Sequence, residues 1–184
     1  DTNSVEEIIK KYDIDTVYHM AAILSAVGEK NPQLCWDVNM NGTNNVLDLA
    51  IKYEMARVII PSSIAVWGDY VPLDNTPQES VLKPGTMYGV TKVCGELLCD
   101  YYHIRYGVDT RGVRFPVLIS YGAPPGGGTT DWAVDIFYQA VEHGRYTCFL
   151  ATEILQPGYH LLNGLLTRQA VAGSFLDPFG DQEQ

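Results

Sequence analysis

The stretch ARVIIPSSIAVWG, residues 56–68, joins an apolar, β-branched run to a proline and two serines. This pattern predicts a buried β-strand that breaks at Pro61. Long helical patterns flank it over residues 31–55 and over residues 87–107, where Gly107 can terminate the helix. Strands that alternate with long helices are typical of an α/β fold, so we expect a parallel sheet with helices on both faces.

The same alternation extends along most of the chain, and Pro32 fits the first turn of the helix over 31–55. The other predicted elements are a helix over 4–12 with Ser4 as N-cap, strands over 14–22 and 108–120, a helix over 131–144 closed by Gly144, and a strand over 145–150. Residues 151–184 lack a sustained period and contain only a weak helical pattern over 159–171. We therefore expect a domain over residues 1–150 and a divergent tail over 151–184.

The composition restricts the class of partner. The chain has 12 basic and 22 acidic side chains among 184 residues, a formal net charge of −10. This charge disfavours nucleic acid and anionic membranes as partners. It is compatible with a nucleotide cofactor, because such sites bind phosphates through backbone N–H groups and helix ends.

The cysteines suggest neither a disulfide framework nor a metal site. Cys35, Cys94, Cys99 and Cys148 form no CxxC pair and no zinc-ligand spacing, so we expect reduced thiols and no metal. No apolar run reaches the length of about 18 residues that a membrane-spanning helix needs. The chain begins at Asp1, and its residues give no indication of where the protein is located.

Three segments rich in small and hydroxyl residues follow the predicted strands. They are AAILSAVGE (21–29), PSSIAVWG (61–68) and YGAPPGGGTTDW (121–132). In open α/β sheets ligands bind at the carboxyl ends of the strands, so these segments are expected to line one site. Small residues allow a ligand to approach the backbone closely, and hydroxyls supply directional hydrogen bonds.

Tyr88 and Lys92 lie one helical turn apart and therefore share a helix face. An ammonium about 4 Å from a phenolate contributes about 4 kcal/mol at an effective dielectric near 20. This energy is enough to lower a tyrosine pKa from about 10 by about three units. Such a tyrosine can act as a general base on an alcohol or as a general acid on a ketone. The spacing alone, however, favours the plainer alternative of helix packing with a solvated lysine.

Ser63 adds weight to the catalytic alternative, because it follows the buried strand directly. Its hydroxyl can bond both a substrate oxygen and the phenol of Tyr88, although a strand-end cap, a role that Ser62 can also fill, is the plainer alternative. Asn39 lies inside the first long helix, where asparagine is a poor helix former. It is either an exposed helix residue or a polar group that anchors a water or a backbone segment near the lysine.

Five segments, in this order and spacing, resemble the extended short-chain dehydrogenase/reductase family. They are HMAA (19–22), DVNMNGTNNVLDLA (37–50), PSSIAVWG (61–68), YGVTK (88–92) and RFPVLIS (114–120). The resemblance covers about residues 1–150 and implies a Rossmann-type domain that binds NAD, with Ser63, Tyr88 and Lys92 as the catalytic set. It also implies that NAD is bound by Ala21, Ala22, Asn39, Tyr88, Lys92, Pro116, Val117 and Leu118.

A narrower resemblance concerns AAILSAVGEKNP (21–32) and PGGGTTDWAVDIFYQAV (125–141), which are similar to short-chain-type L-threonine 3-dehydrogenases. It implies NAD-dependent oxidation of the L-threonine side-chain hydroxyl to 2-amino-3-oxobutanoate. A glycine-rich turn that leads into a helix N-terminus offers free N–H groups to the substrate carboxylate. The implied substrate-binding residues are Ser25, Ser63, Tyr88, Gly128, Thr129 and Thr130.

The chain departs from this family at both ends. It has no GxxGxxG turn to hold the pyrophosphate, and the resemblance stops near Leu150. A smaller departure is Val117, where the threonine dehydrogenases usually have glycine. We therefore expect a partial Rossmann-like sheet that lacks the first strands and in which residues 16–22 form an exposed edge. We also expect the 184-residue chain to bind NAD weakly or not at all and to be inactive.

Two alternatives stand beside the threonine dehydrogenase. A sugar-nucleotide epimerase or dehydratase shares the Ser-Tyr-Lys set, but the GGGTTDWA turn favours the amino-acid substrate. A non-catalytic, truncated family member is the other alternative. The complete protein is expected to be an intracellular homodimer, in the cytoplasm or the mitochondrial matrix, with a small amino acid as substrate and no nucleic-acid or membrane partner.

Overall fold

Two short parallel sheets carry the fold. The structure, a computed structural model, describes residues 1–72, 74–116, 118, 122 and 131–146. The first sheet has the strand order β1-β2-β4, from β1 (Thr16–Tyr18), β2 (Arg57–Ile59) and β4 (Thr110–Arg111). The second pairs β3 (Ser62–Ser63) with β5 (Arg114–Phe115). All pairings are parallel, so the expected α/β class is confirmed.

The predicted strands over 56–68 and 108–120 each divide in two. Pro61 separates β2 from β3, because proline has no N–H for the ladder. A 3-10 turn, η2 (Ile64–Val66), follows β3. Gly112 separates β4 from β5, and a Cβ on Gly112 would lie 2.7 Å from the Ile60 carbonyl oxygen, too close for any other residue.

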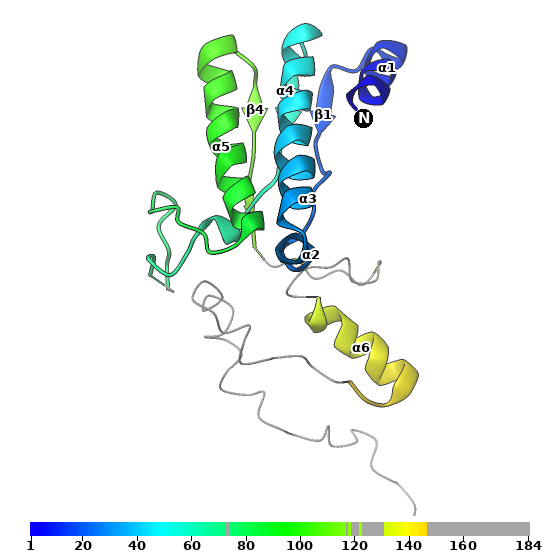
Figure 1. Cartoon of the computed structure of the whole chain (residues 1–184), viewed down its shortest axis with the longest axis vertical. Helices are drawn as coiled ribbons and strands as arrows, with labels where there is room; N and C mark the ends of the chain where they lie inside the picture. The colour runs from blue at the N-terminus through cyan, green and yellow to red at the C-terminus, as the bar shows by residue number, and fades with distance from the viewer. Residues whose placement is uncertain (73, 117, 119–121, 123–130, 147–184) are drawn as a thin grey trace, which may run out of the picture.

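A nearly continuous helical column joins β1 to β2. It consists of α3 (Pro32–Trp36), a π-helical turn η1 (Asp37–Asn41) and α4 (Gly42–Lys52), preceded by α2 (Ser25–Lys30), which the sequence did not predict. The side chain of Asn31 caps α3 by accepting a hydrogen bond from the Leu34 N–H at 3.2 Å. Figure 1 shows α3 and α4 beside α5 (Met87–Tyr106), which joins β3 and η2 to β4.

Most of the expected helix ends are correct. Gly107 and Gly144 close α5 and α6 (Trp132–His143) with φ of 74° and 65°, as predicted from their positions. Ser4 is not the N-cap of α1 (Thr2–Tyr12), because Asp1 accepts the capping bond from Asn3 N–H instead. Residues 145 and 146 form no strand, and the rest of the strand expected over 145–150 lies outside the described residues, as do the tail over 151–184 and its helical pattern over 159–171.

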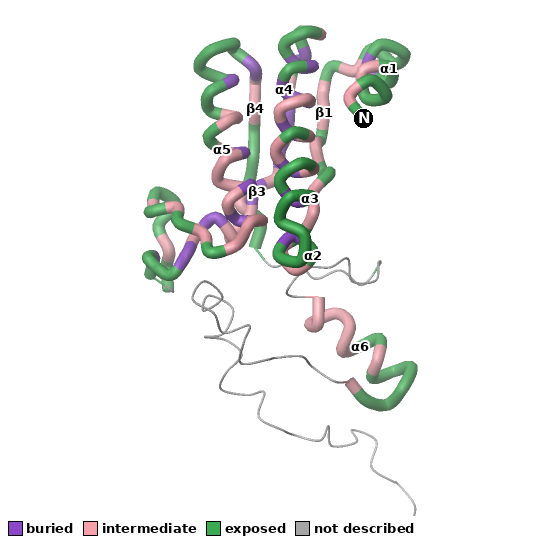
Figure 2. The backbone as a smooth tube through the Cα atoms, in the orientation of Figure 1, coloured by how far each residue is buried: buried purple, intermediate pink, exposed green. Residues whose placement is uncertain are grey.

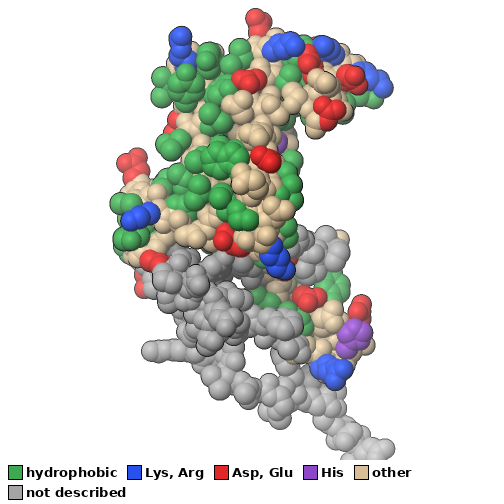
Figure 3. Space-filling view, viewed as in Figure 1, with side chains coloured by type: hydrophobic (Ala, Val, Ile, Leu, Met, Phe, Trp, Pro, Cys, Tyr) green, Lys and Arg blue, Asp and Glu red, His purple; other side chains and the backbone are tan. Residues whose placement is uncertain are grey.

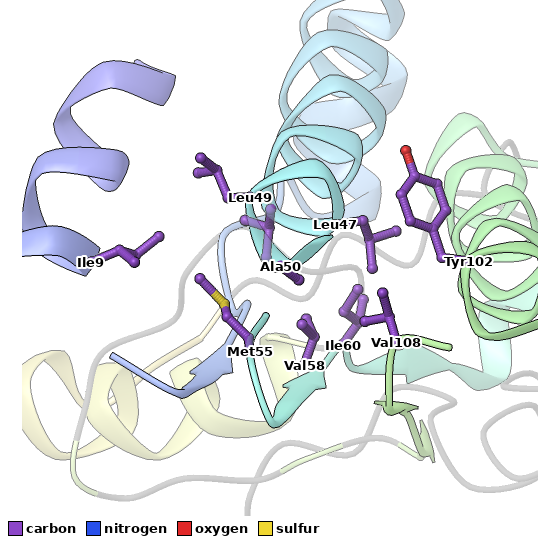
Figure 4. Close-up of a cluster of buried hydrophobic side chains, with 10 residues drawn as sticks. Ile9, Leu47, Leu49, Ala50, Met55, Val58, Ile60, Tyr102 and Val108 are labelled. Carbon is purple, nitrogen blue, oxygen red and sulfur yellow. The ribbon is translucent and has the colours of Figure 1, made fainter. Parts of the chain in front are cut away.

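The main core lies between the strands and the helices α1, α4 and α5 (Figure 4). Both crossovers, β1 to β2 and β2 to β4, run in the same direction along the sheet, so α4 and α5 lie on the same face. Figure 2 shows buried residues on the sides of these helices that meet the strands. The core side chains are Ile9, Val46, Leu47, Leu49, Ala50, Met55, Val58, Ile60, Tyr102 and Val108.

β1 is an edge strand of the described sheet, because β2 is its only described neighbour. The side chains around its end are solvent-accessible, with Tyr18 69% and Met20 67% exposed. The expected edge strand is therefore confirmed for Thr16–Tyr18, whereas residues 19–22 form no strand. In the described part of the chain, no helix combines the length and the apolar character needed to cross a membrane.

Candidate active site

The structure brings Ser63 and Tyr88 together. Ser63 ends β3, Tyr88 lies in the first turn of α5, and the Ser63 hydroxyl lies close enough to the phenol to lower its pKa. Gly89 makes this approach possible, because a Cβ there would lie 2.3 Å from the Ala65 carbonyl oxygen. The Thr86 hydroxyl caps α5 by accepting a hydrogen bond from the Gly89 N–H at 3.0 Å, which fixes where the helix begins.

Lys92 lies one turn further along the same face of α5. Its Nζ is 5.5 Å from the centre of the Tyr88 ring and donates a hydrogen bond to the Pro61 carbonyl oxygen at 2.7 Å. Pro61 ends the strand that leads to Ser63, so the lysine links the helix to the strand end. The predicted set of Ser63, Tyr88 and Lys92 is thus assembled within one region.

The charge state of this set differs from the expectation. Burial raises the pKa of Tyr88, and the nearby Ser63 hydroxyl only partly opposes this rise. Burial also lowers the pKa of Lys92. The expected lowering of the tyrosine pKa by the lysine does not occur in the protein alone, because burial penalises both charged forms and the ammonium is directed to a carbonyl oxygen.

A cavity of about 530 Å³ opens beside Lys92, and Ala21, Ala22 and Asn39 also line it. Two buried ring nitrogens in its lining, His19 Nε2 and Trp67 Nε1, have no hydrogen-bond partner among the described residues. Burial and the nearby Lys92 lower the pKa of His19, which favours its neutral form. Unpaired polar atoms are costly in a protein interior, so this cavity fits a ligand rich in hydrogen-bonding groups, such as the ribose of a dinucleotide.

Asn39 is buried, with 6% of its surface exposed, so the interpretation as an exposed helix residue is wrong. Its Oδ1 accepts a hydrogen bond from the Ile23 N–H at 2.7 Å, and its Nδ2 donates to the Ile23 carbonyl at 3.1 Å. Nδ2 also lies 3.0 Å from the Thr91 hydroxyl oxygen. Asn39 therefore anchors the backbone next to Ala22 and connects it to the residue before Lys92.

Ser25 begins α2, which lies against the start of α5. Glu29 of α2 accepts a hydrogen bond from the Met87 N–H at 2.7 Å, so α2 contributes to the N-terminal end of the helix that carries Tyr88. The remaining predicted substrate residues, Gly128, Thr129 and Thr130, lie outside the described residues.

The segment expected to meet the nicotinamide is described only in part. Pro116 and Leu118 are exposed and do not line the cavity, and Val117 lies outside the described residues. Their roles stay predictions. The free cysteines Cys35, Cys94 and Cys99 are consistent with reduced thiols, and within the described ranges no group of His, Cys, Asp or Glu could hold a metal ion.

Glu96 and Arg114 also line the cavity and form an ion pair with two hydrogen bonds. The sequence did not indicate either residue. Glu96 lies four residues after Lys92, a spacing that could have placed it on the catalytic face of the helix. Nothing in the local sequence around Arg114 indicates its partner.

Three comparisons relate this chain to known proteins. Residues 1–158 match the model of a family described as the NAD dependent epimerase/dehydratase family. An uncharacterised epimerase/dehydratase of Staphylococcus haemolyticus is 54% identical over 79% of this chain and 46% of its own length. The chain thus spans about half the length of the curated relatives that it matches.

Solved structures also match this chain. A monomeric L-threonine 3-dehydrogenase from a metagenome is 54% identical with a TM-score of 0.79, over 82% of this chain and 49% of that one. A UDP-glucose 4-epimerase of Thermus thermophilus, in complex with NAD, is 25% identical with a TM-score of 0.70, over 80% of this chain and 47% of that one. The Rossmann-like arrangement is therefore shared with proteins of both activities.

Proposed function

Because the chain belongs to the NAD dependent epimerase/dehydratase family, we propose that it forms the catalytic part of a NAD-dependent dehydrogenase that oxidises L-threonine. The observation that carries the proposal is the placement of Ser63, at the end of β3, close to Tyr88 of α5, with Lys92 one helical turn away. This arrangement suits proton transfer from an alcohol, and it supports an oxidoreductase reaction close to Lys92, the member of the set that lines the cavity.

NAD, when bound, accepts the hydride from the alcohol carbon and brings a positively charged nicotinamide ring. The cavity residues Ala21, Ala22 and Lys92 would hold it, with Lys92 on the nicotinamide ribose. The positive charge of the bound cofactor would favour the Tyr88 phenolate, which burial alone disfavours.

The side chains of this protein then handle the proton and the oxygen. Tyr88 takes the proton from the threonine hydroxyl, while Ser63 donates a hydrogen bond to the same oxygen as it becomes a carbonyl. The carbon loses its hydride, so the amino acid becomes 2-amino-3-oxobutanoate.

Three features support threonine as the substrate. The metagenome-derived threonine dehydrogenase is 54% identical, whereas the NAD-bound epimerase is 25% identical. Ser25 opens α2, which contacts α5, the helix that carries Tyr88. The third feature is the glycine-rich turn that is predicted to bind the substrate carboxylate, and it stays a sequence-based prediction. It contains Gly128, Thr129 and Thr130.

A sugar-nucleotide epimerase or dehydratase is the second candidate, favoured by the names of the staphylococcal relative and of the Thermus structure. Both candidates need the same proton transfer, so the substrate has to be determined by assay. A non-catalytic role is the third candidate, because the chain spans about half of its curated relatives' length.

The test uses a hybrid enzyme in which residues 1–150 of this chain replace the matching segment of the metagenome-derived threonine dehydrogenase. We expect the hybrid to reduce NAD with L-threonine and not to interconvert UDP-glucose and UDP-galactose. NADH absorbance and sugar-nucleotide chromatography measure the two reactions side by side. Epimerisation without threonine oxidation would overturn the substrate assignment, and a folded hybrid without either activity would favour the non-catalytic alternative.

We also infer that the complete protein is a homodimer that associates through α5. Leu97, Tyr101 and Ile104 follow one another at helical spacing, and all three are exposed. Figure 3 shows hydrophobic side chains gathered on the upper left of the visible face, where Figure 1 places α5. An exposed apolar stripe of this kind suits a second copy of the same helix, because a two-fold axis pairs the stripe with itself.

A further inference from the structure

Glu96 on α5 connects three elements of the site. Its Oε1 accepts hydrogen bonds from the Ser62 hydroxyl at 2.5 Å and from Arg114 Nε at 2.8 Å. Its Oε2 accepts a second bond from Arg114 Nη2 at 2.7 Å. Because the guanidinium is a rigid planar fork, two bonds to one carboxylate fix both the distance and the orientation of the partners.

Arg114 is held on its remaining sides as well. Its Nη1 donates to the Gln78 carbonyl oxygen at 2.7 Å, and the guanidinium lies 5.3 Å from the centre of the Trp67 ring. The side chains of Arg114 and Glu96 are only 14% and 23% exposed. Burial alone would raise the pKa of Glu96, but the hydrogen bonds from Arg114 and Ser62 lower it overall, so the carboxylate is ionised at neutral pH.

Each member of this cluster neighbours a residue of the proposed chemistry. Glu96 lies one turn after Lys92 on the same helix. Ser62 directly precedes Ser63 in β3, and Arg114 begins β5, whose Phe115 is paired with Ser63. The cluster therefore connects the element that carries Tyr88 and Lys92 with the strand that carries Ser63.

We propose that Glu96 and Arg114 are positioning residues that hold β3 against α5, so that the Ser63 hydroxyl meets the phenol of Tyr88. The inference rests on the proposed function for its catalytic consequence, but not for the geometry. Hydrogen bonds between side chains of two separate elements require both elements to be placed within a few tenths of an ångström. The hydrogen bond from Lys92 to the Pro61 carbonyl is one connection between α5 and the strand segment. The hydrogen bond from Ser62 to Glu96 is a second connection, and two connections together prevent β3 from rotating relative to α5.

Another ion pair in the chain provides a matched control. Asp109 bonds Arg57 Nε at 2.9 Å and Arg111 Nε at 2.9 Å, and hydrogen bonds from Arg111 and Arg57 lower its pKa to about 2. It directly precedes β4 and makes no described contact with Ser63 or Tyr88. Asp109→Asn thus removes a carboxylate charge from two arginines without touching the catalytic pair.

The first experiment measures the NMR resonance of the Tyr88 phenol in the full 184-residue chain. Tyrosine labelled with ¹³C at the ζ carbon gives one resonance per ring at neutral pH, and Tyr88→Phe identifies the resonance of Tyr88. Ser63→Ala marks where this resonance moves when the phenol loses its serine partner. We expect Glu96→Gln to move the Tyr88 resonance toward the Ser63→Ala position and Asp109→Asn to leave it in place.

A second variant separates positioning from folding. Glu96→Gln leaves the Arg114 charge without its partner, and Glu96→Gln combined with Arg114→Gln removes this unpaired charge. We expect the double variant to recover stability, measured by urea unfolding, but not the wild-type resonance of Tyr88. Arg114→Lys, which keeps the charge and loses the fork, should shift the resonance in the same direction by a smaller amount.

The third readout is kinetic, in the hybrid enzyme defined above. Glu96→Gln should lower kcat by about tenfold or more while the KM values stay within about twofold, because misplaced catalytic groups reduce the chemical step. An unchanged Tyr88 resonance in folded Glu96→Gln, or an equal displacement in Asp109→Asn, would overturn the inference. The resonance is read without any substrate, so failure of the threonine assay would leave this result standing.

Discussion

At the residue scale, Tyr88 combines a burial that raises its pKa with a nearby Ser63 hydroxyl that lowers it. The i,i+4 spacing to Lys92 could be read from the sequence, since it depends only on helix geometry. The direction of the pKa shift could not, because it depends on how many atoms from distant segments surround the ring. The same holds for Glu96, whose partner Arg114 lies on a different element.

Replacing Tyr88 by phenylalanine tests the role of its phenol. In the hybrid enzyme we expect Tyr88→Phe to lower kcat at least about a hundredfold, because a positioned general base is lost while the ring packing is kept. Tyr101→Phe is the matched control, since Tyr101 is an exposed tyrosine on the same helix. Steady-state rates of NADH formation measure both variants, and near-normal turnover in Tyr88→Phe would remove the residue from the mechanism.

At the element scale, the π-helical turn η1 is the feature that the sequence left undecided. Asparagine in a long helix is compatible with an exposed position or with an anchor, and only the structure shows that Asn39 binds both backbone groups of Ile23. The wider turn brings Asn39 to the inner side of the column, next to Thr91 of α5. The helix ends at Gly107 and Gly144, in contrast, follow from glycine's freedom to adopt positive φ and were predicted correctly.

The Asn39 contacts should matter for stability. We expect Asn39→Ala to lower the free energy of unfolding by about 2 kcal/mol or more, because the Ile23 N–H and carbonyl lose their partner in a partly buried position. Asn41→Ala, on the same turn but exposed, should change it by less than about 0.5 kcal/mol. Urea unfolding followed by circular dichroism compares the two, and equal losses would show that Asn39 is not an anchor.

At the scale of the whole molecule, two surfaces invite association. The free side of β1 presents unpaired backbone groups to solvent in the described sheet, and α5 presents an apolar stripe. In the hybrid enzyme the host protein's own strands accompany the sheet, so the α5 stripe can be tested by itself. The metagenome-derived relative is named as monomeric, which makes any dimer of the hybrid attributable to residues of this chain.

We expect the hybrid to sediment as a dimer and Ile104→Lys to shift it toward monomer, because a charge within the stripe must be desolvated on association. Ile104 is 82% exposed, and Val141 on α6, 88% exposed, gives the control variant Val141→Lys. Analytical ultracentrifugation over a concentration series measures both. A hybrid that stays monomeric at all concentrations would contradict the homodimer proposal.

The sequence by itself determined the features that depend on neighbours along the chain. These are the alternation of strands and helices, the break at Pro61, the helix ends at Gly107 and Gly144, and the spacing of Tyr88 and Lys92. Only the tertiary structure decided the contacts of Asn39 with Ile23 and of Glu96 with Arg114, and the charge state of the catalytic tyrosine. Those contacts join residues 16 or more positions apart, and pKa values follow burial, so both arise only when separate elements pack together.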